Sequence, residues 1–332
     1  MAVRREEATE LPGLGDIELR PSAPVKKLPI DRPIRTEPGE GEPVSTGSAS
    51  SDAPSSHNVG RSKAVFPTPP PLKHHGPARV IALCNQKGGV GKTTTSINLA
   101  ASLAEYGRKV LAVDFDPQGA LSVGLGVAAQ DGLTVYDLLL GRERDATKVI
   151  RSTSTPNLDV LPANIDLSAA EVHLVTEVGR EHILARALRQ VTDSYDVILI
   201  DCQPSLGLLT VNALTAAHGV IIPLESEYFA LRGVALLVDT IDKVRDRLNP
   251  AIKLDGILTT MYDPRTLHSR EVLDRVVEAF GDTVFDTLIH RTVKFPDATV
   301  AAEPITTFAP THSAAEAYRR LARELVARGA VA

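Results

Sequence analysis

Short apolar runs recur along the chain from residue 80 onward, and glycine-rich or polar turns follow them. Five such runs occupy residues 80–83, 110–113, 197–200, 220–224 and 256–259. They are continuous rather than alternating, which predicts strands buried on both faces. Amphipathic stretches lie among them and predict helices over residues 93–106, 181–191, 207–217, 231–248 and 268–280.

This alternation of strands and helices predicts an α/β fold with a mostly parallel sheet flanked by helices. In such a fold the functional groups gather at the carboxyl ends of the strands. The apolar runs that end in glycines or acids are therefore the places to look for chemistry.

Residues 1–78 have a different composition. They hold 13 of the 23 prolines, a Ser/Gly-rich stretch over 45–56, and Phe66 as the only aromatic residue. A segment with so few large apolar side chains cannot offset its ordering entropy, which predicts a disordered Pro/Ser-rich tail over 1–78 and one folded domain over 79–332. The tail is either a plain extension or a docking segment through its proline-rich residues 67–77.

Charge and cysteine content exclude several classes of protein. The tail holds ten basic and ten acidic residues, so the whole net charge of −5 belongs to residues 79–332. A globally basic nucleic-acid binder is excluded, and any DNA contact has to come from a local patch. Two cysteines exclude a disulfide scaffold and a four-cysteine metal site. The lack of a membrane-spanning apolar run and the charged N-terminus predict a cytoplasmic protein.

The turn after the first apolar run carries the main candidate chemistry. It reads Lys87-Gly88-Gly89-Val90-Gly91-Lys92-Thr93-Thr94. Glycines let successive backbone N–H groups surround phosphate oxygens, and the helix that follows points its positive end at the same place. In such a loop Lys92 reaches the β- and γ-phosphates and the hydroxyl of Thr93 ligates Mg²⁺. These residues predict a nucleotide site.

The loop departs from the common G-x-x-x-x-G-K-[ST] form, because Gln86 replaces the first glycine and a second lysine, Lys87, follows it. A lysine at that place is badly placed to fold back onto its own loop and well placed to reach a nucleotide held by a second subunit. The loop resembles that of the ParA/MinD family of deviant-Walker P-loop ATPases, whose signature lysine occupies this position. The resemblance implies a single P-loop NTPase domain.

Further residues are assigned by this resemblance. It implies ATP and Mg²⁺ as cofactors, with catalytic roles for Lys87, Lys92 and Asp116; Asp116 orients the attacking water. Asp114 supports the metal and lysine shell, and Asp201 holds Mg²⁺ through water. The family usually has two prolines after this last acid. Here the first of them is Gln203, which predicts a softer switch II segment.

Two later segments, residues 223–233 and 260–266, are similar to those of the ParA/Soj branch, so the resemblance covers about residues 79–328. It implies non-specific DNA binding by Arg265 and Arg291, and Arg270 and Lys294 extend that patch. The alternative is that these are ordinary solvated side chains. Met261 is a candidate adenine contact, while residues 295–304 diverge from the family.

The implied function is a slow Mg²⁺-dependent ATPase that forms an ATP-sandwich homodimer, binds double-stranded DNA without sequence preference, and acts in chromosome or plasmid partitioning. The branch implies a ParB-type centromere-binding partner and a nucleoid-associated location. The C-terminal helix presents a narrow stripe of Tyr318, Leu321 and Leu325, which predicts a packed helix and no membrane insertion. The alternatives are a MinD-like or polar-organiser ATPase that acts on membrane or protein partners, and a nucleotide-gated regulator of replication or transcription.

Overall fold

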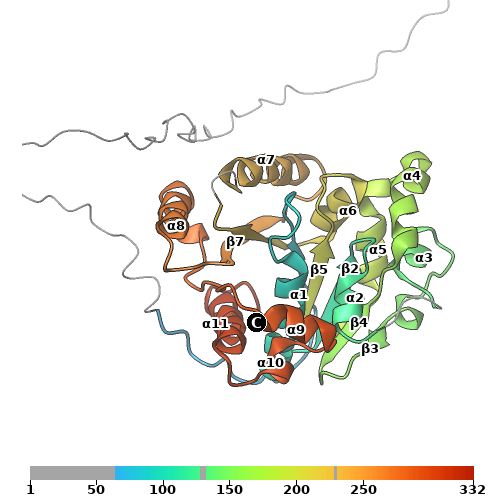
Figure 1. Cartoon of the computed structure of the whole chain (residues 1–332). Coiled ribbons are helices and arrows are strands. Elements are labelled where there is room, and N and C mark those ends of the chain that lie inside the picture. The colour runs from blue at the N-terminus through green and yellow to red at the C-terminus, as the bar shows by residue number, and fades with distance from the viewer. Residues whose placement is uncertain (1–63, 128–131, 228–229) are drawn as a thin grey trace, which may run out of the picture. The chain divides into compact units, whose positions relative to one another are not determined.

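A seven-stranded sheet forms the centre of the computed structural model, which describes residues 64–127, 132–227 and 230–332 (Figure 1). The order across the sheet is β3-β4-β2-β5-β1-β6-β7, and only the edge pair β3–β4 is antiparallel. The strands are β1 (Arg79–Leu83), β2 (Val110–Phe115), β3 (Arg151–Ser152), β4 (Leu158–Leu161), β5 (Val197–Cys202), β6 (Gly219–Glu225) and β7 (Lys253–Thr260).

Helices cover both faces of this sheet, and successive residues of each strand point to opposite faces. Val80 and Ala82 of β1 pack on one side, while Ile81 and Leu83 pack on the other. The first side is covered mainly by α3 (Val135–Leu139), α4 (Ala170–His173), α5 (Ile183–Arg189), α6 (Leu208–Ala216), α7 (Ala230–Arg247) and α8 (Leu267–Phe280). The second is covered by α1 (Lys92–Glu105), α2 (Ala120–Gly124), α9 (Lys294–Val300), α10 (Ile305–Phe308) and α11 (Ser313–Ala327).

The predicted α/β fold is confirmed. The five apolar runs form β1, β2, β5, β6 and β7, and the five predicted helices are α1, α5, α6, α7 and α8. The sequence analysis missed β3 and β4. Strand β4 has four residues and one of them is Asp159, whose carboxylate accepts a hydrogen bond of 2.8 Å from the Tyr195 hydroxyl. This distant partner lets an acid lie within a short strand.

The last part of the predicted tail, residues 64–78, lies against the domain, and we call it the strap. The backbone carbonyl of Pro70 accepts a hydrogen bond of 2.9 Å from the guanidinium of buried Arg108, whose Nε donates to the carbonyl of Ala332 at 3.1 Å. Near the end of the strap, the amide of Gly76 donates to Asp196 at 2.9 Å. The predicted disorder of residues 1–63 lies outside the described residues.

The C-terminal helix packs as the sequence predicts. Tyr318, Leu321 and Leu325 of α11 are each at most 1 % exposed and belong to the core on the α1 side of the sheet. Among the helices of residues 64–127, 132–227 and 230–332, none has both the length and the apolar character that a bilayer crossing requires.

Candidate nucleotide-binding site

The glycine-rich loop lies in the middle of the sheet, between the end of β1 and the start of α1. Gly89 and Gly91 have φ angles of 76° and 82°, a left-handed conformation that explains why glycine is needed there. The neighbouring strands fix the loop. Asn85 donates to the carbonyl of Pro223 in β6 at 2.7 Å, and the Thr260 hydroxyl at the end of β7 donates to the carbonyl of Val90 at 2.9 Å.

The two lysines of the loop point to different places. Lys92 is 6 % exposed, and its ammonium donates to the loop carbonyl of Lys87 at 3.1 Å. Burial lowers the pKa of Lys92, and this effect outweighs the attraction of Asp201. The Lys87 side chain is 42 % exposed and reaches Glu225 at the end of β6, with an Nζ–Oε2 distance of 3.0 Å, and also Glu227. Hydrogen bonding to Glu227 is the main cause of the raised pKa of Lys87.

Asp201 is a fully buried acid that contacts the residues at the start of α1. It lies near the end of β5 and accepts hydrogen bonds from the hydroxyls of Thr93, at 2.7 Å, and Ser96, at 2.9 Å. Burial, followed by the charge of Asp114, raises the pKa of Asp201 to about 7. The Thr93 hydroxyl and this carboxylate are hard oxygen donors held side by side, the donor type that Mg²⁺ prefers. These two residues fit the predicted metal.

Asp114 is the direct neighbour of Asp201 across the β2–β5 pair. Its carboxylate accepts from the amide and the hydroxyl of Ser122 in α2, at 2.8 and 2.7 Å. Burial raises the pKa of Asp114 to about 6. Since these bonds come from α2, Asp114 ties the segment after β2 to the sheet, an arrangement that complements the predicted supporting role.

Asp116 lies just past the end of β2 and is partly exposed. Its carboxylate accepts from the amide of Gln118 at 3.0 Å, and it lies near enough to Lys92 to favour the charged ammonium. The predicted water-orienting acid is therefore on the same side of the loop as the buried lysine. Its role stays a prediction.

Gln203, which stands where the family usually has proline, is held by its side chain. The amide nitrogen donates to Glu171 of α4 at 3.0 Å and to the Ser205 hydroxyl at 2.8 Å. Proline can make neither bond. The sequence analysis predicts a softer backbone here, and the structure adds a connection from this segment to α4 that no motif indicates.

The predicted DNA-binding residues fall into separate groups. Arg265 and Arg291 lie on neighbouring loops, because the Tyr262 amide donates to the carbonyl of Ile289 at 3.0 Å and the Arg291 amide donates back to Tyr262 at 3.3 Å. Both side chains are paired with acids: Arg265 with Asp263, at 2.8 Å, and Arg291 with Glu225, at 3.1 Å.

The other predicted members of the patch lie on helices. Arg270 is exposed on α8. Lys294 begins α9, where it pairs with Asp297 at 3.3 Å and lies over the ring of Phe308, so it faces α10. Met261, the predicted adenine contact, has a φ of 51°, and its sulfur lies 3.8 Å from Arg291 Nη2. The structure thus brings Met261 and the loops of Arg265 and Arg291 together. Lys294 lies apart from them, on α9, where it faces α10.

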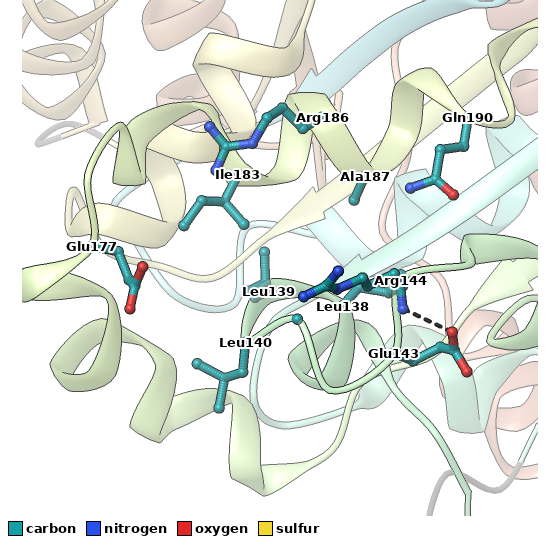
Figure 2. A pocket seen from close by; sticks show the side chains of 11 residues that line it. Leu138, Leu139, Leu140, Glu143, Arg144, Glu177, Ile183, Arg186, Ala187 and Gln190 are labelled. Atoms are coloured by element: carbon teal, nitrogen blue, oxygen red, sulfur yellow. Dashed lines mark hydrogen bonds between the residues drawn. The ribbon is translucent and has the colours of Figure 1, made fainter.

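A pocket of about 330 Å³ lies elsewhere, among the helices on the α5 side of the sheet. Figure 2 shows side chains from α3, α5 and the loop after α3 around it. Its lining is Leu138, Leu139, Leu140, Gly141, Glu143, Arg144, Glu177, Ile183, Arg186, Ala187 and Gln190, so it includes none of the predicted site residues. The predicted phosphate-binding residues lie at the carboxyl ends of the strands, outside this pocket.

Several site residues were missed by sequence reasoning. They are the groups that hold the predicted ones: Asn85 for the loop, Ser96 for Asp201, Ser122 for Asp114, and Glu225 and Glu227 for Lys87. Only Asn85 and Ser96 lie close enough to the motif in sequence to have been suspected.

Comparisons with known proteins agree with this geometry. A family model described as an AAA domain matches residues 78–254. An uncharacterised protein of Mycobacterium tuberculosis is 56 % identical over 319 residues, which cover 96 % of this chain and 98 % of that protein. The chromosome-partitioning ATPase Soj of Treponema pallidum is 52 % identical over 250 residues, which cover 75 % and 98 %.

A solved structure is also similar. It is described as a cobyrinic acid a,c-diamide synthase from Mycobacterium smegmatis with bound ADP and magnesium, and a second structure of that protein carries an ATP analogue and magnesium. The identity is 42 % and the TM-score 0.68, with 76 % of this chain and 96 % of that chain covered. The M. tuberculosis match extends well into the residues before 64, whereas the Soj match covers only three quarters of the chain.

Proposed function

The chain belongs to the ParA/MinD family of P-loop ATPases, and we propose that it is an ATP-driven switch of the partitioning branch. In this proposal it binds ATP and Mg²⁺, forms an ATP-sandwich homodimer, holds DNA without sequence preference, and releases it after slow hydrolysis. It then acts in chromosome or plasmid partitioning with a ParB-type partner on the nucleoid.

Nucleotide binding is supported by the loop and by the solved relative with ADP and magnesium. The backbone N–H groups of Gly88–Thr94 receive phosphate oxygens, and the Lys92 ammonium neutralises their charge. Thr93 and Asp201 hold the metal, which when bound neutralises charge on the β- and γ-phosphates. Val90 and Thr94 belong to the same nucleotide-binding loop. The distance of 2.7 Å between the Thr93 hydroxyl and the Asp201 carboxylate supports this pairing of oxygen donors.

The observation that carries the switch is the opposite orientation of the two lysines. Lys92 lies inside its own loop, while Lys87 points out of it toward Glu225 and Glu227. An ammonium that points out of its own phosphate loop can reach the nucleotide of a second subunit once it leaves these two acids. ATP then favours the dimer because it binds the dimer better than the monomer.

Hydrolysis is phosphoryl transfer to water, in which positioning and charge neutralisation supply most of the catalysis. Asp116, at the end of β2, orients the water that attacks the γ-phosphate. The DNA contact is a local one, since the folded part of the chain is acidic. Arg265 and Arg291 are the proposed phosphate contacts, and Arg270 on α8 and Lys294 on α9 are the proposed extensions of that patch.

The two lysines also give the test. Lys92→Ala is expected to lose nucleotide binding, measured with a fluorescent ATP analogue. Lys87→Ala is expected to bind the analogue normally and to remain a monomer with ATP in light scattering. If Lys87→Ala dimerises as well as the parent, Lys87 acts on its own loop and the sandwich proposal fails.

DNA and membrane targets are separated by a paired assay. Co-sedimentation with random-sequence duplex DNA and flotation with anionic liposomes are each measured with ATP and with ADP. The proposal expects ATP-dependent binding to DNA alone. Binding to liposomes alone favours a MinD-like ATPase.

One comparison favours a second candidate. The similar M. smegmatis structure is described as a cobyrinic acid a,c-diamide synthase, a name that indicates amide formation. Such an enzyme would use the same ATP site to activate a carboxylate of cobyrinic acid. Cobyrinic acid and an ammonia source would then raise ATP turnover, with one amide formed per ATP. No such stimulation is expected from the partitioning proposal.

A further inference from the structure

Glu225, the last residue of β6, holds two cations with one carboxylate. Its Oε2 lies 3.0 Å from Lys87 Nζ and its Oε1 lies 3.1 Å from Arg291 Nη2. The carboxylate side chain is 13 % exposed, whereas the Lys87 and Arg291 side chains are 42 % and 66 % exposed. The acid is thus fixed at the strand end, and the two cations come to it from the loops after β1 and before α9.

Both cations belong to the proposed switch, on which this inference rests. Lys87 has to leave the carboxylate before it can contact a phosphate of the partner's nucleotide. Arg291 has to leave it before its guanidinium can contact a DNA phosphate. A carboxylate and a phosphate compete for the same donors in the same way, because both are anionic oxygen acceptors.

We propose that Glu225 is an internal competitor that holds Lys87 and Arg291 in reserve, so that it lowers both ATP-dependent dimerisation and DNA affinity. Its carboxylate occupies the two cations in place of the nucleotide phosphate and the DNA phosphate. One carboxylate pairs with both cations. When one cation leaves, the full negative charge of Glu225 acts on the cation that remains. Glu225 therefore also links the nucleotide face of the molecule to its DNA face.

Neighbouring acids supply matched controls. Glu227 pairs with Lys87, and its side chain is 53 % exposed. Asp263 pairs with Arg265 through both carboxylate oxygens, at 2.9 and 2.8 Å. Neutralising Glu227 removes one of the two acids that hold the dimerisation lysine, and neutralising Asp263 releases a DNA arginine. Of these three acids, Glu225 alone pairs with a cation of each kind.

The experiment uses the full chain and three isosteric variants, Glu225→Gln, Glu227→Gln and Asp263→Asn. Dimerisation with ATP is followed by light scattering, and binding to a random-sequence DNA duplex by fluorescence anisotropy at several salt concentrations. Exposed ion pairs support changes of about two- to fivefold. Glu225→Gln is expected to strengthen both dimerisation and DNA binding by that factor, Glu227→Gln mainly dimerisation, and Asp263→Asn DNA binding alone.

A second parent chain, which carries Arg291→Ala, tests whether the effect of Glu225→Gln on DNA binding depends on Arg291. In an Arg291→Ala chain, Glu225→Gln is expected to strengthen DNA binding no more than its effect on dimerisation explains, since Lys87 is still released while the DNA cation that Glu225 holds is missing. If Glu225→Gln leaves both functions unchanged or weakens both while the parent dimerises and binds DNA, the inference is wrong and the proposed function stands. If the parent neither dimerises with ATP nor binds DNA, both are wrong.

Discussion

The buried carboxylate of Asp201 gives a prediction in which stability and function move in opposite directions. Its pKa is about 7, against 3.8 for the free side chain, because burial and the charge of Asp114 oppose ionisation. At pH 8 the folded protein carries this carboxylate as an anion, at a cost of about 4 kcal/mol relative to the unfolded chain. Asp201→Asn has the same shape and removes that cost.

The hydrogen bonds survive the change. The hydroxyls of Thr93 and Ser96 now donate to the carboxylate, and one of them can rotate to accept from the new amide. We therefore expect a free energy of unfolding that is higher by up to about 4 kcal/mol at pH 8. For a domain of this size that corresponds to a rise in Tm of roughly 5 °C or more.

The gain in the free energy of unfolding of Asp201→Asn is larger at high pH than at low pH. A carboxyl group with a raised folded pKa binds its proton more tightly in the folded state, so stability falls as pH rises from about 4 to 7. At pH 5 the folded Asp201 is mostly neutral and only the ionisation of the unfolded side chain opposes folding, so the cost that the variant removes is much smaller than at pH 8. The rise in Tm at pH 5 should be less than half of that at pH 8.

The assay is thermal unfolding without nucleotide or metal at the two pH values, with Asp263→Asn as control. Asp263 is partly exposed, and hydrogen bonding to Arg265 lowers its pKa to about 2, so its neutralisation should not raise Tm at pH 8. Addition of ADP and Mg²⁺ should stabilise the parent and leave Asp201→Asn almost unchanged. An Asp201→Asn chain that is no more stable than the parent at pH 8, or whose gain is equal at both values, would refute the reasoning.

Three further outcomes are expected. Asp116→Ala should keep ATP bound and accumulate the dimer, because the acid acts after assembly; a monomer with full ATPase rate in light scattering and phosphate-release assays would contradict this. Arg265→Ala with Arg291→Ala should weaken binding to every DNA sequence alike and flatten the salt dependence by about 0.9 log units for each DNA phosphate that the variant no longer neutralises. An unchanged slope would move the DNA surface elsewhere. Gln203→Pro should lose the bonds to Glu171 and Ser205 and destabilise the fold by about 1 kcal/mol in urea unfolding; a more stable variant would mean that these bonds contribute nothing.

Much of the fold is local enough for the sequence to predict. The runs at 80–83 and 197–200 are apolar throughout because both faces of β1 and β5 are covered by helices. Strand β4 was not predicted because one of its four residues is Asp159, an acid whose hydrogen-bond partner, Tyr195, lies 36 positions away in the sequence. A short strand with a distant polar partner leaves no periodic signal.

The site divides in the same way. Lys87, Lys92 and Thr93 belong to one contiguous motif, and their chemistry follows from glycine conformation and charge. The partners of Lys87 come from residues 138 and 140 positions later, brought near by the β1–β6 pair. Such contacts depend on the strand order, which alternating strands and helices do not specify.

The strap contacts the domain at the end of the strands opposite the phosphate loop. Its contacts with Arg108 and Asp196 lie where β2 and β5 begin, whereas the phosphate loop lies where β1 ends (Figure 1). In a parallel sheet these are opposite ends of the strands. In the proposed dimer, which meets through its phosphate loops, these strap contacts of each subunit would therefore lie away from the nucleotide face. The bonds of Arg108 to Pro70 and of Asp196 to Gly76 would then persist when the dimer forms, so assembly would not require the strap to leave the domain.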